Sequence, residues 1–131
     1  MKEEDIFEDR FWGNEFDWFS LDQDGNIAIF ASAGYGHVPI EVRKNHQAYD
    51  LITEKFCLPR LGTKNVWNDY TWYGLYVFDW QIYAGPYLKV AVPSFYQFMP
   101  AKLRKQILAI DGLPVLNVKF KKVNSITIAS N

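Results

Sequence analysis

The chain has 131 residues, of which 49% are hydrophobic and 18% aromatic, and its formal net charge is −1. This length predicts one domain over residues 1–131 with an ordinary core. The near-neutral charge disfavours direct nucleic-acid binding, and no apolar run reaches the roughly 18 residues of a membrane span. Because the first residues are acidic, unlike those of a secretory leader, we expect a cytoplasmic protein.

The charges are unevenly distributed along the chain. Residues 1–24 contain nine acidic and two basic residues, whereas residues 102–122 contain six basic residues and one acidic residue. Such asymmetry can indicate a charged partner, but more often the two charged segments are solvated faces or lie near one another and cancel.

The first half of the chain predicts a β-hairpin. A short acidic helix is expected over residues 3–12, followed by strands over 16–22 and 27–32. Between the strands, Gln23-Asp24-Gly25-Asn26 is a turn in which Gly25 tolerates positive φ. Both faces of the second strand are apolar, so we expect it to be covered on both sides.

The later elements complete an α+β pattern. They are expected, in chain order, as a helix at 39–57, a helical turn at 65–70, strands at 72–80 and 87–92, a helix at 100–109, and strands at 115–120 and 126–128. Consecutive hairpins predict a largely antiparallel sheet with two main helices packed on one face.

Metal and thiol chemistry find little support in the sequence. Cys57 is the single cysteine, which excludes an internal disulfide and a cysteine-based zinc site, and its apolar helical context predicts a buried, inert thiol. The carboxylates of Asp17, Asp22 and Asp24 lack the spacing of a calcium loop, and Asp24 is explained by the turn. We therefore expect no metal and no cofactor.

The segment Gly34-Tyr35-Gly36-His37 precedes a predicted helix. A glycine-rich loop in this position either holds an anion or forms a corner that requires small residues. Asp79 ends the aromatic strand, where it acts as a base in an aromatic pocket or caps a turn. No nucleophile accompanies these residues, so no catalytic residue is nominated and the chain is not expected to be an enzyme.

Several segments resemble the small immunity proteins of bacterial polymorphic toxin systems of the contact-dependent inhibition type. The matching segments cover about two thirds of the chain: Phe16–Pro39 with its Asp24-Gly25 turn and its Gly34 and Gly36 pair, Tyr73–Trp80, Gly85–Pro93, and Leu103 followed by Phe120. None of these segments carries a catalytic motif.

This resemblance implies a cytoplasmic protein that binds a cognate toxin domain and blocks it. If the toxin is a nuclease, its positive groove attracts acidic side chains, and neighbouring aromatic residues supply anchors. The residues expected to contact the toxin are Glu4, Glu8, Asp9, Trp12, Tyr35 and His37. The alternative function is a small ligand-binding or enzymatic domain with a pocket around Tyr35, His37 and Asp79.

Overall fold

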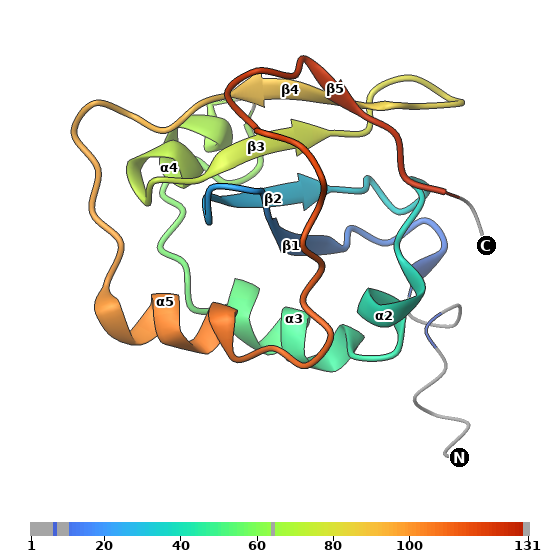
Figure 1. Cartoon of the computed structure of the whole chain (residues 1–131), viewed down its shortest axis with the longest axis horizontal. Helices are drawn as coiled ribbons and strands as arrows, with labels where there is room; N and C mark the ends of the chain where they lie inside the picture. The colour runs from blue at the N-terminus through green and yellow to red at the C-terminus, as the bar shows by residue number, and fades with distance from the viewer. Residues whose placement is uncertain (1–6, 8–10, 64, 130–131) are drawn as a thin grey trace.

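A five-stranded sheet lies at the centre of the molecule, whose computed structural model describes residues 7, 11–63 and 65–129. The strands follow the sheet in chain order and are β1 Asp17–Leu21, β2 Ile27–Ala31, β3 Tyr76–Asp79, β4 Tyr87–Ala91 and β5 Ser125–Ile126 (Figure 1). The structure confirms the hairpin predicted around Gly25, whose φ is +80°.

The sheet is mixed. Three neighbouring pairs are antiparallel, but β2 and β3 run parallel. The α+β class is therefore confirmed and most of the sheet is antiparallel, as expected, but the parallel pair of β2 and β3 shows that the sheet is not built from hairpins throughout. The reason is that the chain returns from β2 to β3 through a helical crossover, which brings β3 in beside β2 in the same direction.

Four helices have both ends within the described residues, rather than the two main helices expected. They are α2 Ile40–Arg43, α3 His46–Thr53, α4 Val66–Trp72 and α5 Ala101–Leu108. In Figure 1, α2, α3 and α5 lie together below the sheet, and α4 lies beside the start of β3.

The helix predicted over 39–57 is divided at Asn45. This residue leaves helical geometry, with φ −121° and ψ 24°, and its side-chain amide donates to the Glu41 carbonyl at 2.9 Å. A side chain that satisfies a carbonyl at a helix end replaces the backbone bond that would continue the helix. The chain therefore bends before α3 begins at His46.

The strand predicted over 72–80 is wrong in its first half. Trp72 ends α4, and the chain then turns at Gly74, whose φ is +86°. A glycine in the left-handed region is the usual residue after a helix end, so it separates α4 from β3. The high β-propensity of Trp72 and Tyr73 is overridden by their packing, since Tyr73 stacks edge-on against Phe56 at 4.8 Å.

Both faces of the sheet are buried. On the helix side, Phe19 stacks on Tyr49 of α3, with ring centroids 6.1 Å apart. On the other side, Trp18, Phe30 and Phe78 of three neighbouring strands form a stacked row with centroid separations of 4.2 and 5.0 Å. Every residue of β2 is buried, which confirms that this strand is covered on both sides.

The segment after α5 joins the two edges of the sheet. Leu21 of β1 donates to the Pro114 carbonyl at 2.9 Å and accepts from Leu116 at 2.8 Å. The segment then crosses the sheet and pairs with β4 as β5 (Figure 1). The strand predicted over 115–120 is therefore wrong, because only Val115 forms a bridge, with Leu21.

Asp22 ties the hairpin turn to this crossing segment. Its carboxylate accepts backbone hydrogen bonds from Asp24 at 2.9 Å, Asn26 at 2.8 Å and Phe120 at 2.9 Å, and the residue is 2% exposed. Burial by itself raises the pKa of the Asp22 carboxyl, but these hydrogen bonds outweigh burial and leave the pKa below its ordinary value.

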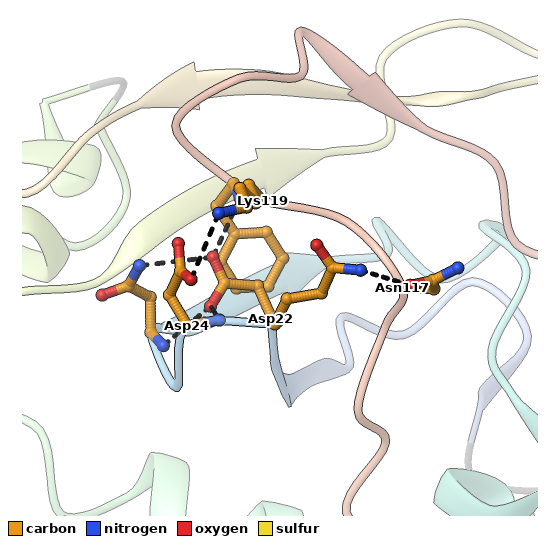
Figure 2. Close-up of polar contacts among 7 residues, drawn as sticks. Asp22, Asp24, Asn117 and Lys119 are labelled. Atoms are coloured by element: carbon orange, nitrogen blue, oxygen red, sulfur yellow. Dashed lines mark hydrogen bonds and ion pairs between the residues drawn. The ribbon is translucent and has the colours of Figure 1, made fainter.

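Two further contacts accompany Asp22 at the turn. Figure 2 shows Gln23 bonded to Asn117, and Asp24 paired with Lys119 at 3.5 Å. Both partners of the Asp24–Lys119 pair are 40% exposed, so this ion pair contributes little to stability. The buried carboxylate of Asp22 therefore provides the main polar link between the turn and the crossing segment.

Within the described ranges, no helix has both the length and the apolar character needed to cross a membrane.

Candidate functional site

A groove forms where the loops that follow β2 and β3 meet. Because these two strands are parallel neighbours, both loops leave the sheet at the same end, where the carboxyl ends of β2 and β3 lie (Figure 1). The groove has a volume of about 710 Å³ and is lined by Trp12, Ala33, Tyr35, His37, Trp80, Gln81, Ile82, Tyr83 and Ala84. We call it the aromatic groove.

Large apolar side chains stand exposed around the aromatic groove. The exposed fraction is 99% for Tyr83, 62% for Trp12, 61% for Tyr35 and 50% for Ile82. Trp80, in contrast, is 9% exposed, so its side chain is largely enclosed by the protein. A concentration of exposed apolar groups around one hollow is typical of a binding site rather than of an ordinary surface.

One side of the aromatic groove forms where the backbone at Gly13 lies close to the backbone at Gly34. The amide of Gly13 donates to the Gly34 carbonyl at 3.1 Å, and this contact brings the segment containing Trp12 beside the loop containing Tyr35. A Cβ on Gly34 would lie 2.8 Å from the backbone nitrogen of Asn14.

A second glycine allows the loop to pack against Trp80. A Cβ on Gly36 would lie 2.8 Å from the Trp80 indole and 2.8 Å from the Tyr87 hydroxyl. The structure therefore supports the interpretation of the Gly34–His37 segment as a corner that requires small residues.

His37 is held by contacts on three sides. Its Nδ1 lies 2.9 Å from the Ile128 carbonyl, and its ring centroid is 5.0 Å from that of Trp80. The Tyr87 hydroxyl donates to the His37 carbonyl at 2.8 Å and accepts from the Trp18 indole at 3.3 Å. The histidine is thus positioned by the core of the sheet rather than by its own loop alone.

The Tyr87 hydroxyl, which donates to the His37 carbonyl, has a raised pKa. Burial raises this pKa, the Trp18 hydrogen bond opposes the shift, and the charges of Asp17, Glu15 and Asp79 raise the pKa further.

Asp79 is half-buried and is not among the described residues that line the aromatic groove. Burial raises the pKa of its carboxyl, and hydrogen bonds from the Gln81 side chain and the Trp80 backbone partly offset that effect. Of the three residues expected around a pocket, Tyr35 and His37 therefore line the groove, and Asp79 does not.

The expected toxin-contacting residues have different outcomes. Trp12 lines the same groove as Tyr35 and His37, although it comes from an earlier segment of the chain. Glu4, Glu8 and Asp9 lie outside the described residues. Trp80, Ile82 and Tyr83 were not among the residues expected to contact the toxin, although two large apolar residues between two predicted strands, Ile82 and Tyr83, were a usable signal.

A second exposed apolar surface lies on the loop between β4 and α5. We call this loop, together with the adjoining Trp72, the aromatic loop. Its exposed apolar side chains are Trp72, Val92, Phe95, Tyr96 and Phe98. Phe98 donates its amide to the Trp72 carbonyl at 2.7 Å, and their rings lie 6.2 Å apart. The loop from β3 to β4, which contributes residues 80–84 to the lining of the aromatic groove, and the loop from β4 to α5 leave opposite ends of β4 (Figure 1).

The acidic residues near the first turn have structural roles. Asp22 organises the turn and Asp24 pairs with Lys119, so these carboxylates are already engaged. Among the residues that the structure describes, no group of three or more His, Cys, Asp or Glu side chains is arranged to hold a metal ion.

The expectation of a buried Cys57 is wrong. The residue is exposed and lines a small hollow with Arg60 and Tyr73. The reason is that α3 ends at Thr53, before the cysteine, so the helical pattern that predicted its burial does not reach it.

We expect the Cys57 thiol of the native protein to react rapidly with Ellman's reagent. An exposed thiol needs no unfolding to meet the reagent, so the native rate should lie within about tenfold of the rate in denaturant. A Cys57→Ser variant provides the blank. A native rate several hundredfold below the denatured rate would contradict the exposed position.

Comparison with known proteins adds no further identification. No protein-family model, no curated protein and no solved structure matches the chain. The fold and the site define an α+β protein with an exposed aromatic groove at the carboxyl ends of two parallel strands of its sheet.

Proposed function

We propose that this chain is an immunity protein that binds a cognate bacterial toxin domain and blocks it. The observation that carries the proposal is the aromatic groove, in which Trp12, Tyr35 and His37 meet the unforeseen Tyr83. The resemblance of four sequence segments to toxin-system immunity proteins supplies the class of partner.

The chemistry of the aromatic groove suits protein binding. Tyrosine and tryptophan dominate the energetics of interfaces because they bury a large area with few rotatable bonds. Tyr83 and Trp12 stand out into solvent, where a partner can cover them, while the enclosed Trp80 and His37 provide a rigid base. An inhibitor needs only such a surface, and it does not need a reacting group.

Growth of bacterial cells tests this function. Cells that express the toxin domain encoded beside the gene for this chain should stop growing, and co-expression of this chain should restore growth. The purified proteins should then form a complex in isothermal titration calorimetry. Continued growth arrest, with both proteins present in the cell, would contradict the proposal.

Matched variants locate the contact. A Trp12→Ser and Tyr83→Ser double variant should weaken toxin binding by at least about thirtyfold, since interface anchors contribute about 2 kcal/mol or more. The control is Phe95→Ser with Tyr96→Ser on the aromatic loop, whose side chains are 89% and 78% exposed. Loss of affinity only in the control would move the contact to the aromatic loop.

A second candidate function is a small-molecule binding or enzymatic domain. The observation that favours it is the volume of the aromatic groove, about 710 Å³, which is within the range of ligand sites. His37 would be its polar group, with Tyr35 beside it. A ligand screen by thermal shift tests this candidate: a hit should lose its effect in the Trp12→Ser and Tyr83→Ser variant.

A further inference from the structure

The protonation of the His37 ring follows from its contact with Ile128. A backbone carbonyl only accepts hydrogen bonds, so the 2.9 Å contact requires that Nδ1 carries a proton. In the neutral imidazole, Nε2 then keeps its lone pair. Among the described residues none donates a hydrogen bond to Nε2, so His37, a residue that lines the aromatic groove, keeps an acceptor that a ligand can use.

Two carboxylates bond directly to residues that line the aromatic groove. Glu15 accepts from the Ala33 amide at 3.0 Å, and Asp79 accepts from the Gln81 side chain. Among the described lining residues none is a lysine or an arginine. A positively charged group in the groove therefore lies near two carboxylates.

The walls favour a flat, delocalised cation. Aromatic faces attract cations, and they do so more often with the arginine guanidinium, which also stacks on rings, than with the lysine ammonium. A guanidinium carries only hydrogen-bond donors, which match the acceptor at His37 Nε2. The exposed rings of Trp12, Tyr35 and Tyr83 offer such faces in the groove that His37 also lines.

We propose that the aromatic groove receives an arginine side chain of the partner protein. The guanidinium stacks against the aromatic walls and donates to Nε2 of His37, while Glu15 and Asp79, which bond to the lining residues Ala33 and Gln81, favour its charge. The inference rests on the proposed function for the identity of the partner, and it names the group that the toxin domain inserts.

The test uses a short peptide in place of the unidentified toxin. The probes are the tripeptides acetyl-Gly-Arg-Gly-amide and acetyl-Gly-citrulline-Gly-amide, which have nearly the same shape but differ in charge. Binding to the full chain is followed by NMR through the indole N–H signals of Trp12 and Trp80. We expect the arginine peptide to shift these signals and to bind at least about fivefold more tightly than the citrulline peptide.

Two substitutions at His37 separate its hydrogen bond from its structural role. The amide nitrogen of His37→Asn can replace Nδ1 at Ile128 while the acceptor is lost, so affinity for the arginine peptide should fall about fivefold. The amide oxygen of His37→Gln can replace the Nε2 acceptor, so this variant should retain more affinity than His37→Asn. Phe95→Ser on the aromatic loop should leave peptide binding unchanged.

The outcomes distinguish this inference from the proposed function. Equal affinity for the arginine and citrulline peptides, or indole signals that do not move, would overturn the arginine assignment even if the chain protects cells. Preferential arginine binding without any protection of cells would support the groove chemistry and contradict the immunity function.

Discussion

The Asp22→Ala variant should be less stable than the unmodified protein by about 3 kcal/mol, which lowers the melting temperature by about 10 °C. The substitution removes the acceptor for three backbone N–H groups, and that of Phe120 is left buried without a partner. Thermal unfolding followed by circular dichroism measures the effect. Asp24→Ala is the matched control, and it should cost no more than about 0.5 kcal/mol because its ion pair is exposed.

The same carboxylate predicts a pH dependence. The pKa of Asp22 is lower in the folded state than in the unfolded chain, so its contribution to stability is present above the unfolded value of about 4. That contribution disappears as the pH falls through the folded pKa. The stability difference between the unmodified protein and Asp22→Ala should therefore shrink below about pH 4. A difference that stays constant down to pH 2 would contradict a charged Asp22.

The Gly34→Ala variant should lose about 3 kcal/mol or more of stability. Alanine at φ +80° is strained, and its Cβ would also lie within 2.9 Å of the backbone of Asn14. Gly25→Ala is the matched control, because Gly25 has the same φ of +80° but no atom within 4 Å of the added Cβ. It should cost about 1 kcal/mol, and chemical denaturation of both variants measures the difference.

The difference in stability loss between Gly34→Ala and Gly25→Ala measures the effect of the steric contact with Asn14, because the backbone strain is the same in both variants. Both lose the conformational freedom of glycine, and only Gly34→Ala pushes the segment containing Trp12 away from the groove. The Gly34 variant should therefore also lose peptide or toxin binding at the aromatic groove. Equal destabilisation of the two variants would show that the contact between residues 13–14 and Gly34 is not close.

Three residues that line the groove were nominated from features that are local in sequence or chemically conspicuous. Tyr35 and His37 were nominated from a glycine-rich loop, and Trp12 from an aromatic group beside acidic residues. Tyr83 was missed because a turn residue between two strands carries no periodic signal. Tyr83 lies in the groove because β3 pairs with β2, which brings the loops after these two strands together, and only the folded sheet provides this pairing.

Cys57 and Trp72 show how a local pattern fails. Both were assigned from neighbouring apolar residues, Cys57 to a buried helix face and Trp72 to a strand. The helix ends before Cys57, and Gly74 turns the chain between Trp72 and β3. Apolar neighbours indicate that burial is favourable, but they do not say which residues of a segment reach the core.

The sequence by itself determined the features that arise from local chemistry. The hairpin around Gly25, the doubly buried β2 and the helix after Pro100 follow from turn geometry and from the spacing of apolar residues. The tertiary structure decided the parallel pairing of β2 with β3 and the crossing segment held by Asp22 and Phe120. Those two residues are 98 positions apart, and contacts over such separations depend on how all the elements pack together rather than on any local pattern.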